Sequence, residues 1–288
     1  MGYIYDSLAT AFRTQKSGFL AVTLPSINNA NFAETYRGLT DAMEGSGMQT
    51  LLGATGYRVE KEEALIRQLL TRNPEALVLT GGHHTKGTRD LIATRNVAVI
   101  EMWDLPFEPL GHSVGFSNAD AMALVVRHMA QTGRTRLAFI GAAEGADSRG
   151  AERRLGARAE ARRLGLQDIT CIDAGPAPVS MRHGAATIER LGAKIKAYDG
   201  LICVSDPVAF GALSACRRLG LAVPDDIAIV GFGNFEVAQV SEPRITTVDV
   251  GARRIGEEVA GLLDALFSGD TAPDQIVVEA KLIPGATT

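Results

Sequence analysis

Hydrophobic residues in this chain alternate between two patterns. Short apolar runs that end at glycine, proline or a polar residue predict buried strands, and the segments between them carry apolar residues three or four positions apart, as amphipathic helices do. The first helix is expected to have Asn31 as its N-cap. The expected strands cover residues 18–24, 50–53, 76–80, 97–102, 137–140, 169–172, 201–204, 227–230, a segment near 247 and 275–279, and the expected helices cover 32–45, 60–71, 88–94, 120–131, 152–164, 181–191, 207–219 and 253–267.

The order of these elements predicts the fold class. Strands that alternate with helices form parallel sheets covered by helices on both faces, and two such series of similar length predict an α/β protein of two Rossmann-like lobes. The series break at residues 115–118, and the last helix is too small to form a lobe, so the chain is expected to cross between lobes more than once. Crossovers of this kind form a hinge, and a cleft between lobes is a natural small-molecule site. The expected N-terminal lobe is 18–116 plus 247–270, and the expected C-terminal lobe is 117–246 plus 271–288.

Composition and charge narrow the class of protein. The formal net charge of −4 gives the whole chain no electrostatic drive toward nucleic acid. Cys171, Cys203 and Cys216 lie in apolar surroundings without metal-ligand spacing, which predicts three buried, reduced thiols and fits a reducing cytoplasm. Residues 1–16 lack the pattern of a secretory leader, and every apolar run is far shorter than the roughly 18 residues of a membrane span. We therefore expect a cytoplasmic protein without a membrane partner.

Candidate ligand-binding residues follow the expected strands. In open α/β sheets, ligands bind in the crevice outside the carboxyl ends of the strands. The residues at these ends mix aromatic rings with Asp, Asn and Arg, which is the mixture that sugars and sugar acids need: a ring stacks on the C–H face of the sugar, and planar polar groups bind its hydroxyls in pairs. The candidates are Ser26, Asn28, Thr55, His83, Trp103, Asp104, Phe116, Arg149, Arg153, Ser205, Asp206 and Asn234.

Several candidates also have a purely structural interpretation. Trp103 and Phe116 are as compatible with core packing as with a ligand site. Arg153 fits a solvated helix face, and Asp206 fits a cap of the helix that opens at Pro207. No metal site is expected at His83 and the histidine after it, because adjacent side chains diverge on a loop and no third ligand lies at a useful spacing.

Motifs of the common catalytic classes are missing from the sequence. It contains no Gly-x-Gly-x-x-Gly after the first strand, no phosphate-binding loop with Gly-Lys-Ser/Thr and no Gly-x-Ser-x-Gly elbow. This favours binding over catalysis, so we expect no enzyme activity and no cofactor.

Two stretches, Val-Pro-Asp-Asp-Ile-Ala-Ile-Val-Gly-Phe at 223–232 and Glu-Pro-Arg-Ile-Thr-Thr-Val at 242–248, carry a family resemblance. With Ser205-Asp206 opening a helix that contains Gly211-Ala212, they resemble the effector-binding core of the LacI/GalR family of bacterial transcriptional regulators, which has a type I periplasmic-binding-protein-like fold. Weaker support comes from Gly133-Arg134 before a strand and from Arg153 before Gly156. The resemblance covers residues 2–283, and residues 101–118 are similar to gluconate-type repressors of the family.

The resemblance implies a function. Family members sense a small-molecule effector, here a sugar or sugar acid, in the interlobe cleft, and the effector controls binding to operator DNA. They form homodimers through the N-terminal lobe and begin with a helix-turn-helix headpiece and hinge helix. This chain is expected to lack the headpiece, with residues 1–17 as a remnant of the hinge or linker.

The resemblance also assigns site residues. Arg153 matches a position that holds an anionic or hydroxyl group of the effector, and Trp103 or Asp104, Phe116 and Asp206 match other cleft positions. The sequence departs from the family pattern twice, because Ser205 stands where Asn is common and Gly233 stands where an effector-binding Asp is common. Loss of that acid favours an anionic effector beside Arg153. The alternatives are a periplasmic sugar-binding protein of a transporter and, third, an α/β enzyme acting on sugars.

Overall fold

The computed structural model describes residues 17–143, 145 and 147–288 and divides into two compact units. Of the described residues, unit 1 contains those up to Gly115 together with Arg253–Val277, and unit 2 contains Phe116–Ala252 and Val278–Thr288. The chain therefore passes from one unit to the other at three places. This division differs from the predicted lobes at residue 116, at 247–252 and at 271–277. The linker predicted at 1–17 lies, apart from Ser17, outside the described residues.

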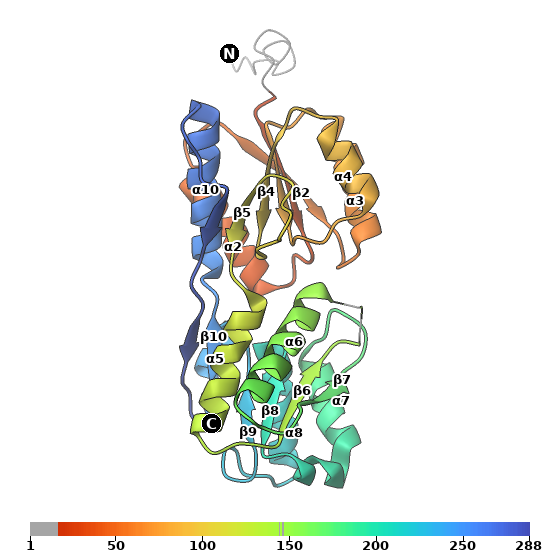
Figure 1. The fold of residues 1–288 in the computed structure, drawn as a ribbon, viewed down its shortest axis with the longest axis vertical. Helices are drawn as coiled ribbons and strands as arrows, with labels where there is room; N and C mark the ends of the chain where they lie inside the picture. Colours follow the sequence, from red (N-terminus) through yellow and green to blue (C-terminus); the bar gives the residue numbers. More distant parts are fainter. Residues whose placement is uncertain (1–16, 144, 146) are drawn as a thin grey trace, which may run out of the picture. The chain divides into compact units, whose positions relative to one another are not determined.

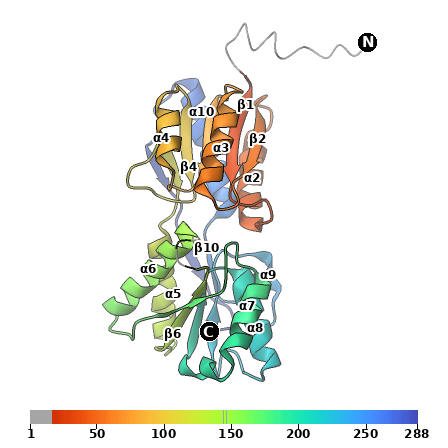
Figure 2. The same cartoon turned by 90° about the vertical axis from the view of Figure 1, so that its right-hand side faces the viewer.

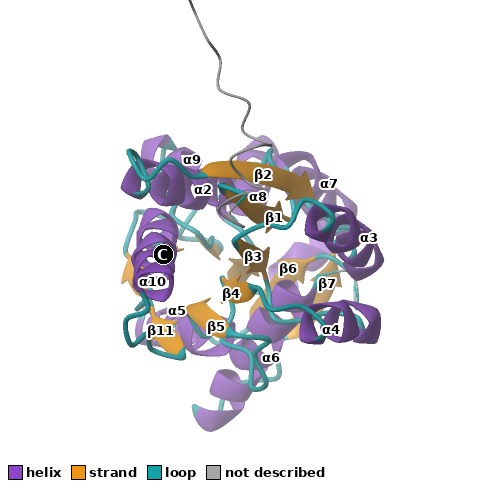
Figure 3. Ribbon diagram, turned by 90° about the horizontal axis from the view of Figure 1, so that it is seen from above, coloured by secondary structure: helices purple, strands orange, loops and turns teal. Residues whose placement is uncertain are grey.

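Unit 1 is built around a six-stranded parallel sheet in the order β11-β5-β4-β3-β1-β2. Figure 1 shows α2 and α10 on one side of this sheet and α3 and α4 on the other, and Figure 3 shows the strand order. The elements are β1 (Phe19–Leu24), α2 (Ala30–Ala42), β2 (Gln49–Ala54), α3 (Val59–Leu70), β3 (Ala76–Thr80), α4 (Lys86–Ala93), β4 (Ala98–Met102), β5 (His112–Gly115), α10 (Ala252–Ser268) and β11 (Gln275–Val277).

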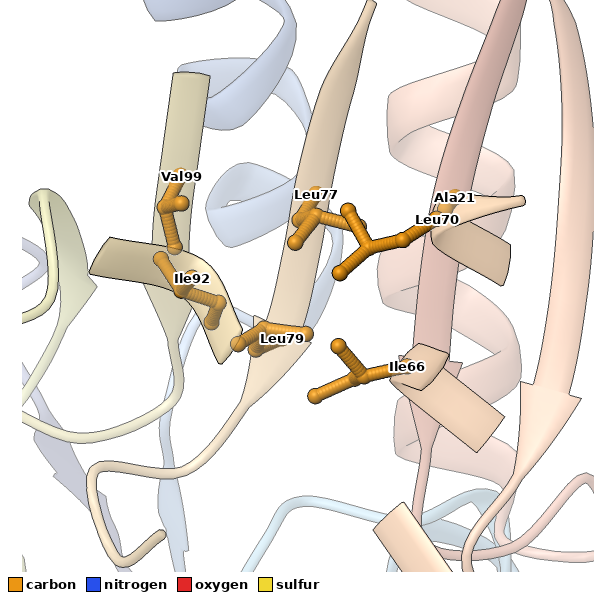
Figure 4. Close-up of a cluster of buried hydrophobic side chains, with 7 residues drawn as sticks. All are labelled: Ala21, Ile66, Leu70, Leu77, Leu79, Ile92 and Val99. Carbon is orange, nitrogen blue, oxygen red and sulfur yellow. The ribbon is translucent and has the colours of Figure 1, made fainter. Parts of the chain in front are cut away.

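The core of unit 1 includes a layer between the sheet and helices α3 and α4. Strands β1 (FLAVTL) and β3 (ALVLT) read as almost continuous apolar runs because helices cover both of their faces. Burying one Leu or Ile side chain contributes roughly 1.5–3 kcal/mol, so this layer fixes the positions of the strands beneath it. Figure 4 shows its buried side chains, Ala21, Ile66, Leu70, Leu77, Leu79, Ile92 and Val99.

On the opposite face, α2 and α10 approach each other closely. A Cβ at Gly38 would collide with the carbonyl oxygen of Arg253, and one at Gly256 would collide with that of Thr35, so glycine is required at both crossing points. The prediction that Asn31 caps α2 was wrong. The N-cap is Asn29, whose side chain accepts the Asn31 N–H at 3.0 Å, and Asn31 itself is buried inside the helix.

Unit 2 contains a four-stranded parallel sheet in the order β7-β6-β8-β9 and a separate antiparallel pair, β10-β12. Figure 2 shows α5 and α6 on one side of the sheet and α7 and α8 on the other. The elements are α5 (Asn118–Gln131), β6 (Leu137–Gly141), α6 (Ser148–Arg163), β7 (Thr170–Asp173), α7 (Met181–Leu191), the 3₁₀ helix η1 (Gly192–Ala197), β8 (Gly200–Cys203), α8 (Asp206–Arg218), β9 (Ala228–Val230), α9 (Glu236–Val240), β10 (Thr247–Asp249) and β12 (Lys281–Ile283).

The parallel α/β class is as predicted, and the differences concern short elements. The sequence pattern does not predict β5, α9 or β12, each of which is three to five residues long. The sequence predicts a strand at 275–279 and places it in the C-terminal lobe. The observed strand there, β11, instead pairs with β5 in unit 1. None of the helices in the described part of the chain is long and apolar enough to cross a bilayer.

The cysteines differ in exposure. Cys203 and Cys216 are buried as predicted, and burial raises the pKa of both thiols, to about 11 for Cys216. The prediction was wrong for Cys171, which is exposed. It lies on β7, the edge strand of its sheet, and most of that strand faces solvent.

Candidate functional site

The carboxyl ends of β8 and β9 in unit 2 lie beside a buried arginine. Arg153 is in the second turn of α6 and is 9% exposed, so the interpretation as a solvated helix face was wrong. Its Nε–H donates to Asn118 Oδ1 at 2.8 Å and an Nη1–H donates to the Val204 carbonyl oxygen, also at 2.8 Å. The guanidinium carbon lies 4.0 Å from the centroid of the Phe232 ring, which is a cation–π distance. These contacts hold the guanidinium in one orientation.

The aromatic ring beneath Arg153 has a second ring as its neighbour, and a second arginine lies one turn before Arg153 on α6. The centroids of Phe116 and Phe232 lie 6.1 Å apart with the rings tilted by 37°. Both rings are buried. Arg149 is also buried and lies one turn before Arg153 on the same face of α6. The candidates Phe116, Arg149 and Arg153 therefore belong to one unit.

Asp206 is the buried anchor of the loop after β9. It is fully buried, and its carboxylate accepts the Thr247 hydroxyl at 2.6 Å and the Phe235 N–H at 2.7 Å. Burial raises the pKa of Asp206 to about 6, although the hydrogen bonds from Thr247 and from backbone N–H groups oppose the rise. A Cβ at Gly231 would collide with this carboxylate. The capping interpretation was wrong, because the N-cap residue of α8 is Ser205 and Asp206 instead binds the loop.

Two further candidates flank this anchor. Ser205 is half-buried between β8 and α8. Asn234 is half-buried, has φ 54° and donates its backbone N–H to Thr247 Oγ1 at 3.2 Å. Gly233, where the family resemblance leads us to expect Asp, has φ 114°, a conformation that L side chains rarely adopt. The departure from the family pattern thus accompanies a backbone that favours glycine.

Unit 1 carries the other group of candidates, with Trp103 and Asp104 directly after β4. Trp103 is 3% exposed, its indole N–H donates to Thr35 Oγ1 at 3.1 Å, and its ring makes a T-shaped contact with Phe32 at a centroid distance of 4.9 Å. Asp104 is also buried and accepts the Gly82 N–H at 3.1 Å. These contacts are those of a core tryptophan, and a ligand contact for either residue stays a prediction.

The remaining candidates of unit 1 lie in the loops after β1, β2 and β3. Thr55 is buried, and its N–H donates to the Leu24 carbonyl at 2.9 Å, which joins the ends of β2 and β1. Ser26 is half-buried and accepts the N–H of the exposed Asn28 at 3.2 Å. His83 is exposed in the β3–α4 loop. Ser26 and Asn28 therefore follow the carboxyl end of β1 and Thr55 follows that of β2, and their contact with a ligand stays a prediction.

Sequence reasoning missed the partners of Arg153 and a second buried cation. Phe232 and Asn118 lay within segments already singled out, but nothing in a single sequence shows that they contact Arg153. The imidazole of His84 is completely buried between two acids: Nδ1 lies 2.6 Å from Glu62 Oε2 and Nε2 lies 3.1 Å from Glu101 Oε1. In the described part of the chain, no group of three or more His, Cys, Asp or Glu side chains is placed to hold a metal ion.

Comparisons with known proteins agree with this architecture. Residues 126–288 match the family model described as a periplasmic binding protein-like domain. The regulator "HTH-type transcriptional regulator GntR" of Escherichia coli K12 is 31% identical over 296 residues, covering 100% of this chain and 86% of the relative.

Solved structures of transcriptional regulators have the same fold as this chain. A LacI family transcriptional regulator from Silicibacter pomeroyi is 36% identical with a TM-score of 0.87, covering 93% of this chain and 98% of that one. The transcription regulator GntR from Chromobacterium violaceum is 31% identical with a TM-score of 0.87 and the same coverage. The fold and these matches define a two-unit, periplasmic-binding-protein-like effector core. The chain belongs to the LacI family of transcriptional regulators.

Proposed function

We propose that this chain senses an anionic sugar derivative, of the aldonic acid class, and that the effector carboxylate binds Arg153. The family supports a role in which an effector changes the affinity of the regulator for operator DNA. That mechanism is a population shift: a ligand with different affinities for two conformations favours one of them. Contact of the effector with the candidate residues of unit 1 stays a prediction.

The geometry of Arg153 is the observation that carries the proposal. Its guanidinium is held between an amide oxygen, a carbonyl oxygen and an aromatic face. Arginine presents a planar fork of N–H groups that matches a carboxylate, and such charge-assisted bonds are about twice as strong as neutral ones. Gly233, in place of the family's common Asp, adds no negative charge to this end of the sheet. Together these features favour an acid over a neutral sugar.

Calorimetry with a matched pair of ligands tests this proposal. An aldonic acid and its neutral aldose are titrated into the wild type and into Arg153→Ala. A charge-assisted contact contributes roughly 1.5–3 kcal/mol, so the variant should bind the acid at least about tenfold more weakly. The control is Arg158→Ala, which removes a partly exposed arginine of the same helix that pairs with Asp168. Equal affinity of the wild type and Arg153→Ala for the acid would contradict the proposal.

A thermal-shift screen identifies the effector class independently. Sugars, aldonic acids, keto-acids and phosphorylated sugars are compared at fixed concentration. A ligand at a hundred times its Kd adds about 2.7 kcal/mol of stability. The proposal expects the largest shift from the aldonic acids, and a shift confined to neutral sugars would contradict it.

We further propose a homodimer formed through unit 1. Strand β2 is an edge of the six-stranded sheet, and edge strands need to be covered or protected. Leu52 on this strand is 40% exposed, and Tyr36 of α2 makes a hydroxyl–hydroxyl hydrogen bond with Thr50 beside it. Leu52→Lys should convert the dimer to a monomer in sedimentation velocity, whereas Leu219→Lys, on an exposed apolar residue of unit 2, should not. A monomeric wild type would contradict this part of the proposal.

The rival interpretations carry less support. The two regulators from Escherichia coli and Silicibacter pomeroyi match almost the whole chain, which favours a regulator over a transporter's periplasmic sugar-binding protein. We propose that the protein acts in the cytoplasm, as expected for contact with operator DNA, and that it does not turn over its effector. Recovery of unchanged ligand after prolonged incubation with the protein, measured by chromatography, tests the last point.

A further inference from the structure

Three ionisable side chains from three elements form a buried network in unit 1. His84 lies in the loop between β3 and α4, Glu62 lies on α3, and Glu101 lies on β4. The His84 and Glu101 side chains are completely buried, and that of Glu62 is 6% exposed. Burying charges is costly, and apolar replacements of similar volume are often at least as stable. The network therefore calls for an explanation other than overall stability.

Both ring nitrogens of His84 have a carboxylate as a hydrogen-bond partner. One nitrogen of His84 faces Glu62 and the other faces Glu101. Only the imidazolium form has two N–H donors, so only this form serves both carboxylates. Burial lowers the pKa of His84, but the hydrogen bonds to Glu101 and Glu62 outweigh it and raise the pKa to about 9. The imidazole is thus cationic at neutral pH.

Glu101 extends the network to the loop of residues 103–111. One carboxylate oxygen faces His84, and the other accepts the Leu110 N–H at 2.6 Å. At the start of the loop, Asp104 accepts the Gly82 N–H, two residues before His84. Pro106 packs on Gly82 so closely that a Cβ there would lie 2.6 Å from the Pro106 Cβ. The loop that begins with Trp103 and Asp104 is therefore bonded at its start to Gly82 and at its end to Glu101, whose other oxygen faces His84.

We propose that His84 is a positioning residue, which holds the 103–111 loop in one conformation through Glu101 and the Leu110 N–H. The protonated form orients Glu101 so that its other oxygen faces the Leu110 N–H, and loss of the proton removes a bond that orients Glu101 and loosens the Leu110 end of the loop. Two other charged groups lie near the network: Glu63 of α3 accepts the Thr85 hydroxyl at 2.6 Å, and Asp104 binds Gly82. The consequence for the effector, a weaker affinity when the loop is released, rests on the proposed function.

Two measurements without any effector test the positioning role. Trp103 is the only tryptophan of the chain and lies two residues after Glu101, so its fluorescence should respond when the protonation of His84 changes the position of Glu101. In the wild type, its emission should change with a midpoint near pH 9, and in His84→Gln the emission at pH 7 should already equal that of the wild type above pH 10. Hydrogen exchange at the Leu110 amide should be about tenfold faster or more in His84→Gln at pH 7.

The matched control is His128→Gln, which removes a half-buried histidine of unit 2 that bonds to Thr288. This variant should keep the wild-type emission profile and Leu110 protection. The proposal is overturned if His84→Gln keeps both properties, or if His128→Gln changes them equally. If His84→Gln does not fold, Glu62→Gln removes one carboxylate and should lower the fluorescence midpoint, and an unchanged midpoint overturns the proposal.

An effector arm separates this inference from the proposed function. With an aldonic acid as probe, His84→Gln should raise Kd by about tenfold at pH 7. If neither protein binds the acid, the proposed function fails while the exchange and fluorescence results still decide the role of His84. If both bind it equally although the loop is released, the link from loop to effector is overturned.

Discussion

His84 of unit 1 and Arg153 of unit 2 are both buried cations, and they are held in different ways. In unit 1, the imidazole of His84 lies between two carboxylates. In unit 2, the guanidinium of Arg153 donates to an amide oxygen and a carbonyl oxygen and lies on an aromatic ring. A histidine between two acids gains or loses its charge with pH, whereas arginine stays protonated in proteins. We infer that the buried charge of His84 in unit 1 changes with pH, whereas that of Arg153 in unit 2 is permanent.

The two buried cations also differ in the charge of their known partners. The carboxylates that hold His84 would remain as uncompensated buried charges if the histidine were removed. Two of the oxygens that hold Arg153, Asn118 Oδ1 and the Val204 carbonyl oxygen, are neutral, and the loss of one donor costs a neutral acceptor less than it costs a buried carboxylate. The difference between the two surroundings therefore predicts different sensitivities to the same kind of substitution.

The largest expected effect is that of His84→Ala on stability. Removing one partner of a buried ion pair costs about 3–5 kcal/mol, so the free energy of unfolding should fall by that amount. Arg153→Ala removes a donor from two neutral acceptors, Asn118 Oδ1 and the Val204 carbonyl oxygen, and should cost less, about 1–3 kcal/mol. Urea titration followed by circular dichroism measures both variants. An Arg153→Ala variant as unstable as His84→Ala would remove the distinction drawn between the two cations.

The second effect is the pH dependence of stability due to His84. Its folded-state pKa of about 9 lies above the unfolded value of 6.5, so the native state keeps a proton that the unfolded state loses. The stabilisation is complete below pH 6.5 and is lost as pH rises to about 9, at about 1.36 kcal/mol per pKa unit or about 3 kcal/mol in all. The difference in unfolding free energy between the wild type and His84→Gln should therefore shrink over this window. A constant difference from pH 6 to pH 10 would mean that the loss of a proton from His84 does not change the stability of the protein.

Sequence patterns were sufficient for the fold class because strands such as β1 and β3 must be apolar on both faces under two layers of helices. Short elements escaped prediction for a physical reason. β5 gains its stability from pairing with β4 and β11 on either side, and those partners are distant in sequence. A four-residue strand has no periodicity of its own to reveal this.

The candidate site was predictable only in part. The rule that ligands bind beyond strand ends selected Arg153, Asp206 and Trp103, but it does not distinguish a side chain that faces a ligand from one that faces the core. Trp103 turned out to bond to Thr35, and Asp206 to Thr247. The sequence presents His84 only as a neighbour of His83, because the acids that enclose its side chain lie 22 and 17 residues away along the chain. Contacts of this kind exist only once the chain is folded.

The third prediction concerns a buried acid, Asp206, in place of the buried cation His84. Asp206→Asn keeps the shape of the side chain but loses one of the acceptors for Thr247 and Phe235, at a cost of about 1–3 kcal/mol. The raised pKa of Asp206, about 6, means that the native state holds a proton that the unfolded state releases above pH 3.8. The wild type should thus lose stability relative to Asp206→Asn as pH rises from about 4 to 6, opposite to the trend of an ordinary salt-bridged carboxylate. Thermal melts of both proteins across this range test the trend, and parallel curves would contradict it.

The smallest effect concerns a neutral hydrogen bond in unit 1, and it separates the core role of Trp103 from any role in binding. The indole N–H of Trp103 donates to Thr35 Oγ1, and Thr35 in turn donates to the Asn31 carbonyl at 3.1 Å. A double-mutant cycle with Trp103→Phe and Thr35→Val should give a coupling energy of about 0.5–1.5 kcal/mol, the net contribution of a neutral hydrogen bond. Both sites are buried, so the coupling should not depend on salt. The effector affinity of Trp103→Phe is measured as well. If this affinity is unchanged while the coupling is present, Trp103 acts as a core residue and does not bind the effector. A coupling near zero would instead contradict a stabilising role for the hydrogen bond from the indole N–H to Thr35.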